Sequence, residues 1–95
     1  MARRRHLIAY DICEPVRLRR VAKVMEAFGT RLQYSVFLCD LSELERMRWR
    51  AEIHEVVDYS EDSVVVIDLG ALDSSAEVVQ LGRPRAMPDS GAAVI

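Results

Sequence analysis

The acidic residue Asp11 closes an apolar stretch that begins at His6, and it is the first candidate for chemistry. A single carboxylate is a poor magnesium site, because Mg²⁺ takes an octahedron of oxygen ligands and keeps several waters among them. If a twofold dimer brought both copies of Asp11 to its axis, two carboxylates and waters could hold one Mg²⁺ or Mn²⁺. Such an ion polarises a phosphoryl oxygen and activates water for phosphodiester hydrolysis. The alternative is that Asp11 caps the following helix, which the residue alone favours.

Three arginines could contact phosphate groups. Arg17 and Arg20 lie in the segment after Asp11, and Arg31 begins the next extended segment. The guanidinium fork matches phosphate geometry and can bind it with two parallel hydrogen bonds. Surface ion pairs with Glu14 or Glu26 are an equally good interpretation of the sequence.

Two aromatic residues, Tyr34 and Phe37, lie in that extended segment. Their positions have opposite parity, so on one strand they point to opposite faces of the sheet. One is expected in the core, and the other lines a cleft beside Asp11 or is buried in a dimer interface. Ser35 has no His or Asp at a readable spacing, so serine-nucleophile catalysis has no support.

The charges of the chain are unevenly distributed, although the formal net charge is only −2. Residues 1–40 carry eight Lys or Arg against four Asp or Glu, and residues 41–95 carry five against eleven. Such asymmetry can form a local phosphate-binding face, but composition alone favours ordinary surface charge. The run from Arg3 to Arg5 fits a solubilising tail.

The length of 95 residues predicts one domain, and 51% hydrophobic residues is more than a lone small domain needs. A second copy of the chain is expected to cover part of that apolar surface. Cys13 and Cys39 are interpreted as packing residues, and without a CxxC motif they give no zinc site. No apolar run approaches a membrane span, and the N-terminal residues lack a signal peptide, so a cytoplasmic, reducing location is expected.

Hydrophobic periodicity and turn residues predict the order of the elements. The expected elements are a strand over 6–12, a helix over 15–28, one long strand or a bulged pair over 30–40, a helix from 43 to about 57, a strand over 63–69 and a short strand over 77–81. We therefore expect a domain over 1–82, followed by a linker and C-terminal segment over 83–95. Four successive β-branched residues, from Val64 to Ile67, predict that their strand is buried on both faces.

The second helix begins with a capping box, in which Ser42 and Glu45 satisfy each other's backbone N–H groups. Its expected buried stripe combines Leu44, Met47, Ala51 and His54, joined by Ile53, Val56 and Val57. Trp49 lies to one side of this stripe and is expected to pack at the helix flank or under a partner.

This order predicts an α+β, ferredoxin-like sandwich, with an antiparallel sheet and two helices on one face. The other face then carries apolar side chains that no helix covers. A sheet from an identical subunit would cover them, so we expect a homodimer.

Several strings of residues, taken in order, resemble a known family. They are Tyr10-Asp11-Ile12, the helix ending at Phe28-Gly29, the string from Arg31 to Phe37, the capped second helix, Asp62-Ser63-Val64 and Leu81-Gly82-Arg83-Pro84. The chain resembles the small CRISPR-associated endoribonucleases, the ferredoxin-like subunit of the spacer-acquisition complex. The resemblance covers nearly the whole chain, and the string from Arg31 to Phe37 is its most specific part.

The resemblance implies a homodimer in which the strand-one aspartates face one another across a cleft. Asp11 would then be the Mg²⁺ ligand, with Mn²⁺ as a second possibility, and Tyr10 would lie beside it in the catalytic site. The family's C-terminal segment pairs with the partner subunit, which implies the same for residues 92–95.

The resemblance also implies nucleic-acid contacts. The positions of Arg20, Arg31 and Phe37 lie near the cleft in the family. A further basic position falls at Leu18 here, so the adjacent Arg17 is predicted to bind nucleic acid. The implied partners are the larger CRISPR integrase and duplex DNA, with single-stranded RNA as another substrate, and no membrane.

Three functions follow from these observations. The first is a metal-dependent endonuclease of RNA or DNA that also binds protospacer DNA during spacer acquisition. The second is a non-catalytic architectural subunit that bridges the integrase on duplex DNA. The third is a toxin-like ribonuclease of the virulence-associated D type, which shares the fold and the dimer.

Overall fold

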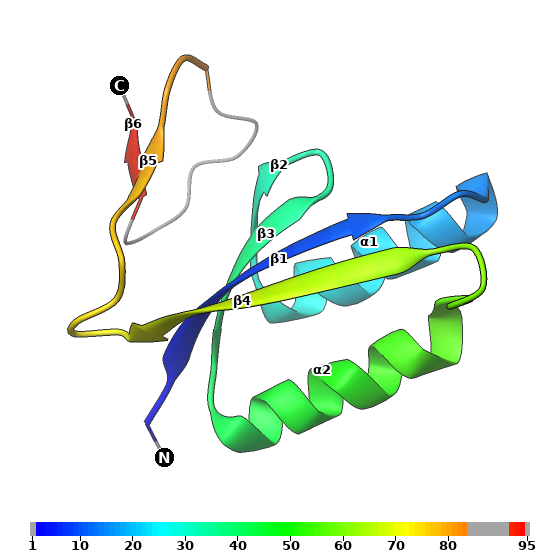
Figure 1. Cartoon of the computed structure of the whole chain (residues 1–95), viewed down its shortest axis with the longest axis horizontal. Helices are drawn as coiled ribbons and strands as arrows, with labels where there is room; N and C mark the ends of the chain where they lie inside the picture. Colours follow the sequence, from blue (N-terminus) through cyan, green and yellow to red (C-terminus); the bar gives the residue numbers. More distant parts are fainter. Residues whose placement is uncertain (1, 84–91, 95) are drawn as a thin grey trace.

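The computed structural model describes residues 2–83 and 92–94. Its main sheet is antiparallel, with the strand order β2-β3-β1-β4, and both helices lie on one face of it (Figure 1). The elements of these two layers are β1 (Arg4–Asp11), α1 (Pro15–Phe28), β2 (Thr30–Gln33), β3 (Val36–Leu41), α2 (Glu43–Val56) and β4 (Ser63–Ala71). This is the ferredoxin-like α+β sandwich that the element order predicted.

The first strand starts earlier than predicted because ion pairs extend it. Arg5 lies opposite Asp40 of β3, and its Nε and Nη2 donate to the two carboxylate oxygens at 2.8 Å each. Arg4 Nε donates to Asp68 Oδ2 of β4 at 2.9 Å. The prediction of a solubilising tail is therefore wrong for these two arginines, because cross-strand carboxylates hold them in the sheet.

Side chains alternate along β1 between the two faces of the sheet. Ile8 and Tyr10 are buried in the core between sheet and helices, with exposed fractions of 0% and 6%. Asp11, the next residue, is exposed on the opposite, helix-free face. The position of Asp11 at the end of a central strand therefore places its carboxylate on the open side of the sheet.

The segment over 30–40 is two strands, not one. A turn at Tyr34 and Ser35 joins β2 to β3, and the register shifts between Arg31 and Gln33. The hairpin packs so closely against the end of α1 that a Cβ at Gly29 would collide with the Cys39 sulfur. Glycine is therefore required here because a side chain has no space. Its backbone is extended, a conformation that any residue could adopt.

The first helix buries the face that its periodicity predicted. Val21 and Met25 are fully buried, and Leu18 and Phe28 pack partly against the same core. The predicted capping box of the second helix is also present, with Ser42 N donating to Glu45 Oε1 at 2.9 Å.

The buried stripe predicted for α2 is correct for Ile53 and Val57 and wrong for its other main residues. The helix buries Trp49 and Ile53, with Val57 directly after it, at the spacing of four that marks one helix face. The other main residues of the predicted stripe are exposed: Leu44, Met47, Ala51 and His54. Trp49 lies in the core and not at the flank, since its Nε1 donates to the Met25 sulfur at 3.1 Å.

The fourth strand is covered on only one face in this chain. Val64 and Val66 pack against the core, whereas Val65 and Ile67 are 51% and 48% exposed on the helix-free face. The prediction of burial on both faces is thus wrong for the single chain.

A short parallel ladder of β5 (Val78–Gln80) and β6 (Ala92–Val94) forms a second sheet (Figure 1). The predicted strand over 77–81 is therefore present. Residues 84–91 of the predicted linker lie outside the described residues, and pairing of the C-terminal segment with a second copy stays a prediction. No helix of residues 2–83 is long and apolar enough to span a membrane.

Candidate functional site

The carboxylate of Asp11 is free of the structural role that its sequence position favoured. Glu14, not Asp11, caps α1: its two carboxylate oxygens accept from the backbone N–H groups of Val16 and Arg17 at 2.8 Å each. Within residues 2–83, Asp11 has no hydrogen-bond or ion-pair partner. An exposed acid at the end of β1 is consequently available to a ligand.

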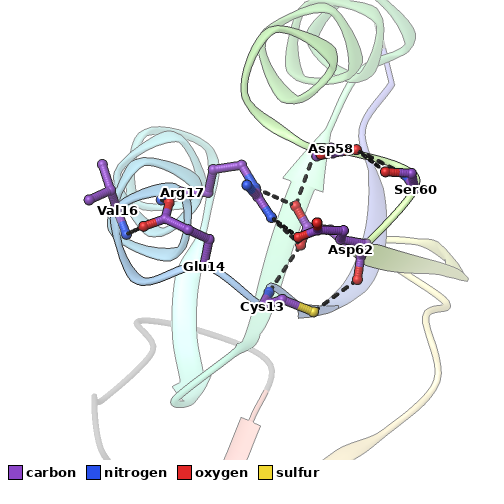
Figure 2. A network of polar contacts seen from close by, with 8 residues as sticks. Cys13, Glu14, Val16, Arg17, Asp58, Ser60 and Asp62 are labelled. Atoms are coloured by element: carbon purple, nitrogen blue, oxygen red, sulfur yellow. Dashed lines mark hydrogen bonds and ion pairs between the residues drawn. The ribbon is translucent and has the colours of Figure 1, made fainter.

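A network around Asp62 fixes the loop that follows Asp11 (Figure 2). The Asp62 side chain is fully buried and accepts from Cys13 N at 3.0 Å and from Asp58 N at 3.0 Å. Arg17 completes the network, with its Nε 2.8 Å from Asp62 Oδ2 and its Nη2 3.1 Å from Oδ1. The Arg17 guanidinium and these backbone N–H groups hold the pKa of Asp62 well below its usual range.

The network joins the connection between β1 and α1 to the turn before β4. Cys13, expected to be a packing residue, is instead exposed, and its sulfur donates to the Glu61 carbonyl at 3.0 Å. Cys39 is buried as expected, and burial raises the pKa of its thiol to about 12. The role of Asp62 could not be predicted from the sequence, because a carboxylate in a polar turn has no local signal that identifies a distant arginine partner.

The predicted nucleic-acid residues on α1 differ in their surroundings. Arg17 is only 20% exposed at its side chain and is engaged by Asp62 and Glu61, so its predicted contact with nucleic acid competes with internal ion pairs. Arg20 is exposed, as are Arg19 and Lys23. In the described part of the chain these three residues make no hydrogen bond or ion pair, and they form an uncompensated basic face of α1.

Tyr10, Arg31 and Phe37 lie together, on the other side of the sheet from Asp11. The rings of Tyr10 and Phe37 stack with centroids 6.2 Å apart, and Arg31 Cζ lies 5.2 Å from the Phe37 centroid. Phe37 is fully buried, as predicted for one of the two aromatics, whereas Tyr34 is 57% exposed. The prediction that the two rings point to opposite faces of the sheet is wrong, because Tyr34 lies in the turn between β2 and β3 and both rings lie near Arg31. Tyr10, Arg31 and Phe37, which were predicted to lie near Asp11 in one site, are thus separated from its carboxylate by the sheet.

These residues line a cleft of about 390 Å³ between α1 and the β2–β3 hairpin. The helix contributes Arg19, Lys23 and Glu26 to its walls, and the sheet contributes Tyr10, Arg31 and Tyr34. Burial raises the pKa of the Tyr10 phenol, and the hydrogen-bonding guanidinium of Arg31 with its charge offsets part of that rise. The cleft therefore combines positive charge with aromatic rings.

The donor chemistry at Asp11 fits a hard cation only in part. Carboxylate oxygen is a ligand that Mg²⁺ prefers, but one chain supplies one such group at this position. Among the described residues, no cluster of three or more His, Cys, Asp or Glu could hold a metal ion. A complete site would require a second carboxylate from another copy.

Comparisons with known proteins converge on one family. The family model described as CRISPR associated protein Cas2 matches residues 4–75 of this chain. A CRISPR-associated endoribonuclease Cas2 from Geobacter sulfurreducens is 39% identical over 69 residues, which is 73% of this chain and 73% of that protein. Another, from Rhodospirillum rubrum, is 37% identical over 79 residues, or 82% of this chain and 78% of that protein.

Solved structures agree with this similarity. A hypothetical protein from Thermus thermophilus, TT1823, superposes with a TM-score of 0.78 at 26% identity, covering 92% of this chain and 99% of that one. The Cas2 protein of Streptococcus pyogenes superposes with a TM-score of 0.62 at 31% identity, covering 66% of this chain and 82% of that one.

Proposed function

The chain belongs to the family of CRISPR-associated Cas2 proteins, and from this premise we propose that it is a nuclease that hydrolyses phosphodiester bonds of RNA or DNA. Relatives from two bacteria carry the name endoribonuclease. The observation that carries the proposal is the exposed Asp11 carboxylate, which has no partner within residues 2–83 and does not cap α1. Because carboxylates in catalytic sites hold cations or move protons, this group is the best candidate for the reacting centre.

The proposed active form is a homodimer that meets across the helix-free face. Val65 and Ile67 of β4 leave about half of their surface uncovered there, and Asp11 ends the neighbouring strand on the same face. A second copy would remove this apolar surface from water, which favours association. The same contact would bring two Asp11 carboxylates to opposite sides of a shared groove.

Mg²⁺, with Mn²⁺ as a substitute, is the proposed cofactor; bound there, it would polarise the scissile phosphate and lower the pKa of a water. The role of Asp11 is to supply one oxygen ligand from each subunit. The exposed Arg20 on α1 is positioned to hold the substrate backbone by charge. Arg17 and Asp62 fix the loop after Asp11, so they position the carboxylate without themselves meeting the substrate.

The rate at which the Asp11→Asn variant cleaves nucleic acid tests the catalytic part of the proposal. We expect the variant to cleave RNA or DNA about 100-fold more slowly or worse, since metal stabilisation of the transition state is worth several kcal/mol. Asp73→Asn is the matched control, because Asp73 is an exposed aspartate in the turn after β4, at the opposite end of β1 from Asp11. Cleavage by Asp11→Asn at the rate of the Asp73→Asn control would contradict the proposal.

Mixed dimers test whether both subunits contribute. After subunit exchange in an equal mixture of the natural chain and Asp11→Asn, activity should fall to about a quarter if each site needs two aspartates. A fall to about one half would show that each chain carries a site of its own. Ile67→Lys should dissociate the dimer and abolish cleavage together, and cleavage by a monomer would refute the shared site.

The uncompensated basic face of α1 favours a second candidate function, an architectural subunit that binds duplex DNA and bridges the CRISPR integrase. Arg19, Arg20 and Lys23 could neutralise phosphates without any metal. If this is the only function, Asp11→Asn retains DNA binding and spacer acquisition, whereas Arg20→Gln weakens both. Spacer acquisition that depends on Asp11 would exclude a purely architectural role.

A further inference from the structure

The cleft between α1 and the β2–β3 hairpin is a candidate site separate from Asp11, because it lies on the helix side of the sheet. Two buried polar groups at its base have no hydrogen-bond acceptor in the described part of the chain: Nε of Arg31 and the hydroxyl of Tyr10, which the Arg31 guanidinium approaches. Arg31 Nε is only a donor and the phenol can donate, so the missing partner is an acceptor. An oxygen-rich anion would satisfy both groups at once.

The walls of the cleft select the charge of such a ligand. Arg31 lies 3.8 Å from the Glu26 carboxylate, which is too long for a hydrogen bond, and Glu26 is 60% exposed. Arg19 and Lys23 face the same space from α1. Three cations against one carboxylate, which pairs only loosely with Arg31, favour an anion such as a phosphate group.

The rim of the cleft also offers an aromatic surface. Tyr34 is 57% exposed and lies on the turn of the hairpin, with Arg31 Cζ 5.9 Å from its ring centroid. Exposed aromatic rings beside arginines stack nucleic-acid bases. The volume of about 390 Å³ is that of a small-ligand site, for which the usual range is roughly 300–1,000 Å³.

We propose that this cleft binds a nucleotide through its terminal phosphate, with the phosphate on Arg31 and the Tyr10 hydroxyl and the base against Tyr34. The ligand is either a free nucleoside monophosphate or the phosphorylated end of a strand, which share this chemistry. Its nucleic-acid origin rests on the proposed function, whereas binding of a free nucleotide does not.

Titration of the full-length chain with AMP, adenosine and inorganic phosphate by calorimetry tests the proposal. AMP should bind more tightly than either fragment, because only AMP uses both the cations and the ring. Arg31→Gln should weaken AMP binding about tenfold or more through loss of a charge-assisted hydrogen bond. Glu26→Gln should strengthen it, since that carboxylate repels the phosphate.

Two further variants guard against loss of folding. Tyr10→Phe removes only a hydroxyl and should weaken AMP binding several-fold while leaving the circular dichroism spectrum unchanged. Arg48→Gln is the matched control, because Arg48 is an exposed arginine of α2 outside the cleft. AMP affinity that is equal in Arg31→Gln, Tyr10→Phe and Arg48→Gln, or no greater than that of phosphate, would overturn the proposal.

Two comparisons separate this site from the hydrolytic one and identify the source of the ligand. Asp11→Asn should keep the full AMP affinity, and loss of AMP binding in that variant would contradict two independent sites. If the natural chain cleaves nucleic acid but binds no AMP, the cleft proposal fails and the nuclease stands. Competition by a 5′-phosphorylated tetranucleotide, but not by its unphosphorylated form, would identify the strand end as the ligand; its absence would identify the free nucleotide.

Discussion

Neighbouring residues of β1 differ in burial because they lie on opposite faces of the main sheet. On the helix-covered face, Tyr10 is 6% exposed and stacks against the buried Phe37. On the helix-free face, Asp11 is exposed, and Ile67 of the adjacent strand is 48% exposed. Each face nevertheless presents an unsatisfied polar group in the described chain: the Tyr10 hydroxyl has no acceptor on one face, and the Asp11 carboxylate has no partner on the other.

This contrast shows that adjacency in the chain does not make one site on a strand. The period of two directs Tyr10 and Asp11 to different environments, one closed by α1 and one open to a second copy. The proposed hydrolysis therefore uses the open face, and the proposed ligand binding uses the cleft on the covered face. The difference between the faces can be tested by substitutions of the same residue type on each side.

The largest effect is expected when one isoleucine on each face is truncated and the free energies of unfolding are compared. The isoleucine on the helix-covered face should cost more. Ile8→Ala should lower the free energy of unfolding by about 2–5 kcal/mol, because the side chain is fully buried in the core. Ile67→Ala should cost less, and its cost should grow with protein concentration as a dimer forms. Urea denaturation at several concentrations measures both, and equal, concentration-independent losses would remove the distinction between the faces.

Two aspartates make a similar pair. Asp62→Ala should lower Tm by about 10 °C, because Arg17 and two backbone N–H groups lose their acceptor inside the structure. Asp11→Ala should leave the Tm of the chain nearly unchanged, since the carboxylate has no partner within residues 2–83. Thermal unfolding followed by circular dichroism decides; a large loss in Asp11→Ala would mean that its role is structural.

Acid should destabilise the fold by protonating Asp62 and Glu45, whose carboxylates accept hydrogen bonds in the folded chain. Hydrogen bonds from Arg17 lower the pKa of Asp62, and those from Arg3 and Ser42 lower the pKa of Glu45 to about 2. A lowered pKa stabilises the fold above the ordinary carboxyl pKa of about 4, and this stability is lost as pH falls through the folded value. We expect Tm to fall between about pH 4 and pH 2, and less steeply in Asp62→Asn.

The smallest effect is expected from the arginines of α1. Arg20→Gln should reduce the slope of log affinity for DNA against log salt by about 1, because one phosphate contact is lost. Arg17→Gln should change this slope less and lower Tm more, since Asp62 and Glu61 already engage the guanidinium. The reverse order would restore Arg17 as a nucleic-acid ligand.

Local patterns in the sequence were sufficient for the first helix and for the element order. The spacing of Val21 and Met25 identified the buried face of α1, and the capping box from Ser42 to Glu45 identified the start of α2. The same method failed for the face of α2, because Trp49 and Ile53 form a shorter stripe than the competing one that contains Leu44 and Met47. Helical periodicity predicts the buried face of a helix only when one stripe is clearly more apolar than the others.

The sequence by itself determined the ferredoxin-like order of elements, the buried face of α1 and Asp11 at the end of an apolar strand, since all three follow from patterns of a few residues. Tertiary structure decided that Arg17 pairs with Asp62, and that Tyr10 and Arg31 share a cleft away from Asp11. These facts depend on contacts between residues as many as 45 positions apart. Only the folded sheet, with its alternating faces and crossing helices, brings such residues together.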